Sequence, residues 1–86
     1  MTSAQHSTLR DGQTIRLPYF NQAIAYLSLA MTQRRLAHIA RREALAWEAA
    51  GDYRRYGPAA VEARRLWREA KWHLQRARMN HERAVS

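Results

Sequence analysis

Histidine and carboxylate side chains are the groups in this chain that could take part in chemistry. Four histidines are present, at His6, His38, His73 and His81, together with seven Asp or Glu residues and no cysteine. No His-Glu-x-x-His motif and no other spacing typical of metal ligands occurs. Glu69 precedes His73 by one helical turn, which is typical of a local pair. The pattern therefore predicts no metal site.

Motifs for covalent or acid–base catalysis are also missing from the sequence. There is no Gly-rich phosphate loop, no nucleophile elbow and no paired carboxylate arrangement. Most of the acidic residues stand beside arginines, which leaves few carboxylates for general acid–base work. We therefore expect no enzymatic activity, no cofactor and no small-molecule substrate.

Arginine and tryptophan supply the strongest functional signal. Fourteen of the 15 basic residues are arginine, and the net charge is +8. Arginine binds carboxylate or phosphate through a planar fork, and Trp and Arg are frequent binding hot spots. On a helix through residues 64–76, Trp72 lies almost opposite the apolar stripe. We call the following five residues the Arg/Trp face and predict that they bind a partner: Arg65, Arg68, Trp72, Arg76 and Met79.

A second candidate surface is the aromatic and basic run Tyr53-Arg54-Arg55-Tyr56, which we expect in a contact loop between two helices. An equally good interpretation is that the tyrosines cap the core while the arginines are solvated. The pairs Arg34-Arg35 and Arg41-Arg42 are seven residues apart and would form a stripe along a helix. We interpret this stripe as solvated surface.

Two long helices are expected to position these residues. Pro18 fits the first turn of a helix, residues 19–50 contain neither Gly nor Pro, and Gly51 is a natural stop. Pro58 suggests the start of a second helix that runs to about Arg83. The short linker between them favours an antiparallel arrangement. The fold class is therefore predicted to be an all-α helical hairpin.

The first helix carries two apolar stripes about half a turn apart. One contains Phe20, Ile24, Leu27 and Met31, and the other contains Leu29, Leu36, Ile39, Ala40 and Trp47. The helix either breaks near residues 32–35 or continues and faces different neighbours along its length. We favour the continuous helix because no breaker stands at the join. The second helix has one core stripe: Ala59, Ala63, Leu66, Trp67, Ala70, Leu74, Ala77, His81 and Ala84.

Residues 1–17 form a polar N-terminal arm, followed by a hairpin domain at 18–86. Asp11-Gly12 is a favoured pair for a tight turn, so the arm can form a short β-ribbon that packs on a helix. The start of the chain lacks the features of a secretory signal. The longest mostly apolar run, residues 23–31, is shorter than the roughly 20 residues that span a membrane. We therefore expect a cytoplasmic protein without a membrane partner.

Size and charge suggest a binding protein. Two amphipathic helices bury little surface, so we expect a homodimer resembling a four-helix bundle, or folding completed against a partner. The favoured function is a non-catalytic inhibitor or adaptor that docks on an acidic surface of a larger protein. Such small regulators are typical of phages and mobile elements that block host defence or transcription. The alternative is direct, backbone-driven DNA or RNA binding, although no zinc finger, helix-turn-helix or sustained zipper heptad is present.

Overall fold

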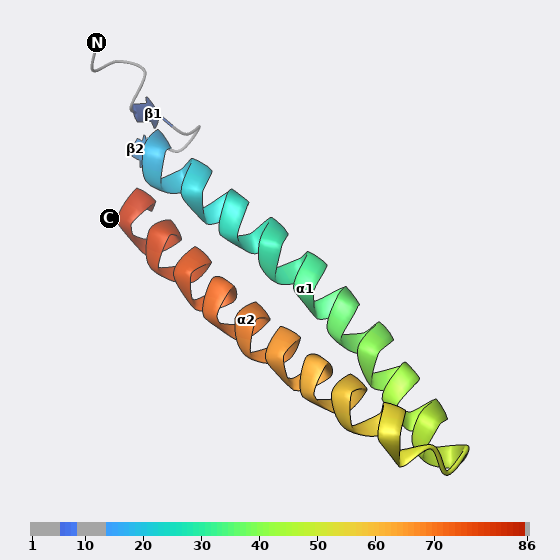
Figure 1. Cartoon of the computed structure of the whole chain (residues 1–86). Coiled ribbons are helices and arrows are strands. Elements are labelled where there is room, and N and C mark those ends of the chain that lie inside the picture. Colours follow the sequence, from blue (N-terminus) through green and yellow to red (C-terminus); the bar gives the residue numbers. More distant parts are fainter. Residues whose placement is uncertain (1–5, 9–13, 86) are drawn as a thin grey trace.

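Two long antiparallel helices make up most of the molecule in the computed structural model, which describes residues 6–8 and 14–85 (Figure 1). Helix α1 spans Leu17–Ala49 and helix α2 spans Tyr53–Val85, with 33 residues each. They lie side by side in a rod with extents of 59 × 21 × 17 Å. The predicted all-α helical hairpin is confirmed. Helix α1 runs without interruption through residues 32–35, so the alternative of a break there is wrong.

A two-stranded ribbon precedes α1, as the sequence predicted. Strand β1 (His6–Thr8) pairs antiparallel with β2 (Thr14–Arg16). Ile15 is buried and β2 contacts both helices, so the ribbon packs at the open end of the hairpin (Figure 1). The Asp11-Gly12 pair lies outside the described residues. Pro18 stands in the first turn of α1, where a backbone N–H has no acceptor within the helix, so the lack of one in proline removes no hydrogen bond.

The turn between the helices ends α1 and begins α2 within three residues. Gly51 adopts a left-handed conformation with φ of 73°. Its N–H donates to Glu48 O at 3.0 Å, and the Asp52 N–H donates to Trp47 O at 2.9 Å. This pair of hydrogen bonds satisfies the last carbonyls of α1 in a Schellman motif. Asp52 Oδ1 then accepts from the Arg55 N–H at 3.2 Å and caps the start of α2.

The predicted start of the second helix at Pro58 is wrong. Helix α2 begins at Tyr53, and Pro58 lies inside it, five residues after the first residue. A proline at this position removes the hydrogen bond to the Arg54 carbonyl, and the Asp52 cap together with the Arg55 contact on Trp47 stabilises the turn that precedes it. The run Tyr53-Arg54-Arg55-Tyr56 is therefore the first turn of a helix and not a contact loop.

The two helices contact each other through one row of buried alanines on each helix, which we call the alanine lines. In α1, every seventh residue is a buried alanine: Ala23, Ala30, Ala37 and Ala44. Helix α2 repeats the pattern with Ala63, Ala70, Ala77 and Ala84. A seven-residue repeat keeps one helix face toward its neighbour, and a side chain of one carbon allows close approach. The prediction that no sustained heptads are present is wrong, because both helices carry a heptad repeat built from alanine in place of large side chains.

Apart from Ala40, the residues of the two apolar stripes of α1 lie on either side of its alanine line. Leu27 is 43% exposed on one flank and Leu29 is 48% exposed on the other. Ile24, Met31, Leu36 and Ile39 are exposed as well, whereas Ala40 is buried. The predicted stripe of α2 fits better, because Ala63, Leu66, Ala70, Ala77 and Ala84 are buried. His81 is exposed, and Asn80 takes a buried place instead.

Candidate protein interface

Trp72 lies at the flank of the helix pair and not opposite the core as the sequence suggested. Its side chain is 48% exposed. The indole meets the Tyr26 ring of α1 edge-on at 6.1 Å between centroids, and it meets the His73 ring at 5.1 Å. The Arg76 guanidinium stacks over the indole at 4.8 Å, a cation–π contact. One part of the Trp72 ring thus packs on Tyr26 of α1, and the exposed part is accessible to a partner.

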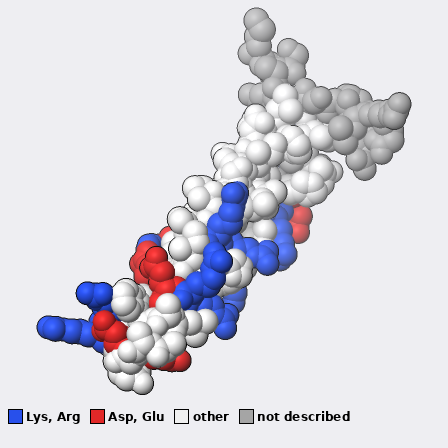
Figure 2. All heavy atoms as spheres, turned by 90° about the vertical axis from the view of Figure 1, so that its right-hand side faces the viewer, with Lys and Arg blue, Asp and Glu red and all other residues white. Residues whose placement is uncertain are grey.

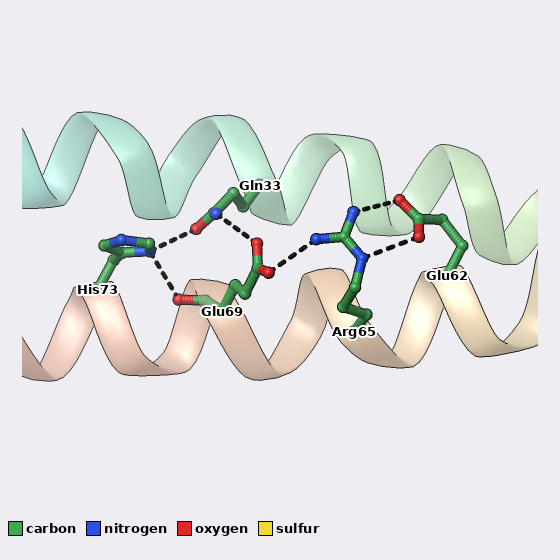
Figure 3. Close-up of polar contacts among 5 residues, drawn as sticks. All are labelled: Gln33, Glu62, Arg65, Glu69 and His73. Atoms are coloured by element: carbon green, nitrogen blue, oxygen red, sulfur yellow. Dashed lines mark hydrogen bonds and ion pairs between the residues drawn. The ribbon is translucent and has the colours of Figure 1, made fainter.

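A polar cluster crosses the helix contact beside Trp72 (Figure 3). Gln33 Nε2 donates to Glu69 Oε2 at 2.9 Å, which leaves Gln33 Oε1 as an acceptor 2.7 Å from His73 Nδ1. The backbone carbonyl of Glu69 also lies 2.9 Å from His73 Nδ1. Because both neighbours of Nδ1 are acceptors, this nitrogen carries a proton and donates.

The cluster has a structural consequence for the register of the helices. An interface of alanines repeats every seven residues, so alanine alone would allow the helices to slip by a heptad. The Gln33 contacts fix one alignment. The His38 ring supports the same alignment, because it meets the Trp67 ring edge-on at 5.1 Å. Sequence reasoning missed this cluster because its members come from helices whose register it could not know.

Arg65 is held within its own helix. It donates to both oxygens of Glu62 and, at 2.7 Å, to Glu69 Oε1 (Figure 3). The hydrogen bonds from Arg65 hold the pKa of Glu62 below its ordinary value of 4.5. The same bonds, chiefly the one to Glu62, raise the pKa of Arg65. Of the Arg/Trp face, Arg65 is therefore already paired, whereas Arg68 is exposed and Met79 is 38% exposed.

The first turn of α2 divides into exposed and engaged residues. Tyr53 is 70% exposed, and Arg54 is exposed beside it. Arg55 stacks over the Trp47 ring at 4.7 Å and forms an ion pair with Asp52 at 3.6 Å. Tyr56 is half-buried and lines a depression with Leu45 and Trp67. Tyr53 and Arg54 remain accessible to a partner, and Tyr56 fits the alternative interpretation of a core-capping side chain.

Exposed cations gather over the middle of the rod. Figure 2 shows Lys and Arg side chains collected there, with a largely uncharged surface nearer the start of α1. Gln33 and His38 contact Glu69, His73 and Trp67, so residues 34–42 of α1 lie beside the α2 residues near Trp67. We call the following exposed residues the cationic band: Arg34, Arg35, Arg41, Arg42, Arg64, Arg68 and Lys71.

Members of the cationic band have no carboxylate partner within the described part of the chain. Arg34 lies over the Trp67 ring at 6.0 Å, and Arg64 donates to the Ala60 carbonyl at 3.4 Å. These contacts orient two side chains without neutralising their charges. The seven-residue spacing of Arg34-Arg35 and Arg41-Arg42 was the sequence signal for the α1 part of the band.

Depressions between the helices form an apolar groove on the flank away from Trp72. One has a volume of about 340 Å³ and the next about 460 Å³, and they share Leu27 and Leu74. We call the following side chains the apolar groove: Phe20, Ile24, Leu27, Met31, Trp67 and Leu74. Over residues 6–8 and 14–85, no three His, Cys, Asp or Glu side chains gather to hold a metal ion. In the same part of the chain, neither helix is apolar enough over sufficient length to span a membrane.

Comparison with known proteins gives no relative: no protein-family model, curated protein or solved structure matches the chain. The function is therefore argued from the surfaces described above.

Proposed function

We propose that this chain is a small, non-catalytic helical binding protein that docks on an acidic surface of a larger protein and acts as an inhibitor or adaptor. The observation that carries the proposal is the cationic band, seven exposed cations that lack an internal carboxylate partner. Arg65, in contrast, forms two ion pairs within its own helix.

Rigid presentation makes the band suited to recognition. Its side chains project from two helices held in one register, so the cations keep a fixed spacing along the rod. Arginine forks bind carboxylates in two-point contacts, and a field of one sign steers an acidic partner toward the surface. The mechanism is steric: a rod 59 Å long covers a surface that another ligand would use.

The Arg/Trp face extends this surface. Arg76 presents its guanidinium on top of the Trp72 ring, so a carboxylate can pair with Arg76 while apolar atoms pack on the exposed part of the indole. Arg76 also covers one face of the indole, which leaves less of the ring for a base to stack on. Exposed aliphatic side chains beside the cations also suit a protein more than a phosphate backbone.

A homodimer acting in the cytoplasm completes the proposal. The helix contact is built mainly from alanine, and none of the described large side chains is fully buried. Several large aliphatic side chains of α1 are about half exposed, which a second copy would cover. The length of the chain is similar to that of the small proteins by which phages and mobile elements block host defence or transcription.

Affinity capture from the native host with a charge-reversed variant tests the proposal. Arg35→Glu with Arg42→Glu removes two outward cations of the band, and Arg10→Glu with Arg16→Glu is a control with the same change in net charge in the N-terminal arm. We expect the wild type and the control to retain one acidic protein, with and without nuclease treatment, and the band variant to lose it. Retention of nuclease-sensitive material alone, or equal loss in both variants, would contradict the proposal.

A further inference from the structure

We infer that two copies of this chain pack antiparallel through the uncharged first half of α1, with Leu27 next to the twofold axis and the apolar groove forming the contact. The inference rests on the proposed homodimer and adds the surface and the symmetry. The groove borders the cationic band, because Arg34 and Lys71 line the depression next to Met31 and Trp67.

Apolar exposure in this half of α1 is large for so short a segment. Ile24 is 50% exposed, Leu27 is 43% exposed and Met31 is 53% exposed, all on the flank that borders the groove. Leu74 and Trp67 of α2 line the opposite wall. The groove thus offers a ridge of side chains on α1 next to a hollow between the helices. This combination accepts the ridge of another helix.

The distribution of charge restricts where a second copy can pack and favours this half of α1 as the site. Each copy carries a net charge of +8, so two copies repel wherever their cations meet. Residues 17–33 contain no Asp, Glu, Lys or Arg, whereas residues 34–42 contain four arginines. The first half of α1 is therefore the stretch of this helix along which two copies approach without bringing like charges together.

An antiparallel pairing keeps the two cationic bands apart. With Leu27 at the axis, Arg34 is the nearest band member of α1 and lies seven residues away in opposite directions in the two copies, which places the two Arg34 positions about 21 Å apart along the helices at 1.5 Å per residue. Screening in physiological salt acts over about 8 Å, so repulsion between the bands is largely suppressed. A parallel pairing would instead lay one band beside the other.

The spacing of the apolar side chains fits the same axis. Ile24 stands three residues before Leu27 and Met31 stands four residues after it. Antiparallel packing about Leu27 therefore places Ile24 of one copy beside Met31 of the partner subunit, and the reverse contact occurs by symmetry. A surface that is complementary to itself in this way is what a closed twofold dimer requires.

The other flank of the hairpin fits a second copy less well. Glu62, Arg65 and Glu69 form a charged row along it (Figure 3), and Arg76 lies further along the same helix over the Trp72 ring. Burying that row against a copy of itself would desolvate several ions. On the groove side, the charged side chains that border the groove are Arg34 of α1 and Lys71, Arg78 and Glu82 of α2, so the partner helix packs on the α1 ridge and the groove and leaves them at the solvent-exposed rim.

Sedimentation velocity over a range of protein concentrations tests the inference. We expect the wild type to be a dimer and Leu27→Glu to weaken dimerisation by at least about a hundredfold, because the substitution occurs twice in a twofold contact. Leu36→Glu is the matched control, since Leu36 is 46% exposed on the other flank of the same helix. It should leave the dimer intact, and circular dichroism should show both variants helical.

The outcomes separate this inference from the proposed homodimer. A monomeric wild type would overturn both and would leave the groove to a different protein. A dimeric wild type that Leu36→Glu dissociates and Leu27→Glu does not would overturn only the surface assigned here. Cross-linking provides a second measurement, because the chain has no cysteine. A short bifunctional thiol reagent should join Leu27→Cys into a covalent dimer and leave Leu36→Cys unjoined, and the reverse would contradict the inference.

Discussion

Enlarging one alanine of the helix contact tests the basis of the fold. Ala37 is fully buried and belongs to the cluster with Ala40, Ala63 and Leu66, against which Trp67 packs. Ala37→Leu adds three carbon atoms where the helices are in contact, so the helices must separate or their side chains must leave favourable rotamers. Overpacking of this kind costs about 1–3 kcal/mol. The change in intrinsic helix propensity is small by comparison.

The expected loss is a large share of the total stability. A domain of this size has an unfolding free energy of about 4–13 kcal/mol, from roughly 0.05–0.15 kcal/mol per residue. A loss of 1–3 kcal/mol corresponds to a fall in melting temperature of about 4–24 °C, at roughly 4–8 °C per kcal/mol. Ala25→Leu is the control, because Ala25 is exposed on the same helix.

Urea unfolding followed by circular dichroism at one protein concentration provides the assay. A fixed concentration is needed because dimerisation contributes to the apparent stability. We expect a lower midpoint for Ala37→Leu and an almost unchanged midpoint for Ala25→Leu. If Ala37→Leu is as stable as the wild type or more stable, the helices do not meet along the alanine lines, and the larger apolar stripes must form the contact instead.

Three further perturbations probe the turn, the ion pairs and the Arg/Trp face. Gly51→Ala should destabilise the protein by about 1–2 kcal/mol, because Gly51 has a φ of 73°. Gly57→Ala within α2 should be neutral or stabilising. Equal effects of the two substitutions in urea unfolding would contradict the Schellman turn. The Arg65 bonds lower the pKa of Glu62, so the stabilisation they give is present above the ordinary value of 4.5 and is lost as the pH falls through the lower pKa of the folded protein. Glu62→Gln should therefore reduce the loss of thermal stability on acidification. An unchanged dependence of melting temperature on pH would refute this role. Trp72→Ala should weaken partner capture and keep the helical circular dichroism. About half of the indole is buried, so the loss of unfolding free energy is roughly 2–3 kcal/mol. Unfolding of the variant would show that Trp72 is a core residue.

Local signals explain which parts of the fold were predictable. Pro18 and Gly51 mark the two ends of α1, and the lack of Gly or Pro between them predicted one long helix. Pro58 predicts the wrong start for α2, because a proline typical of a first turn lies inside this helix. Asp52, a favoured capping residue directly after Gly51, was the better signal. A proline tolerated inside a helix cannot be recognised from its position alone.

The alanine contact was harder to predict because hydrophobic patterning emphasises large side chains. Leu27, Leu29 and Leu36 suggested two core stripes, yet the smaller Ala30 and Ala37 between them form the contact. Small residues at every seventh position indicate closely packed helices, and this period is present in the alanine lines of both helices.

The candidate site was predictable only in part, because pairing depends on register. Sequence spacing placed Arg68 and Arg76 one turn from Trp72, and Arg76 does stack on its ring. Contacts of Trp72 with Tyr26, and of Gln33 with Glu69 and His73, join residues that are far apart in the chain. Their partners follow from the alignment of α1 with α2, which no local pattern specifies.

Fluorescence anisotropy with labelled DNA and RNA tests most directly whether the cationic band serves a protein partner. Single- and double-stranded forms are titrated with the full chain at low and at near-physiological salt. We expect any binding at low salt to vanish at the higher salt, because the band then acts only as a nonspecific cation field toward phosphate. Micromolar or tighter binding that survives near-physiological salt, and that Arg35→Glu with Arg42→Glu abolishes, would make nucleic acid the partner and contradict the proposed function.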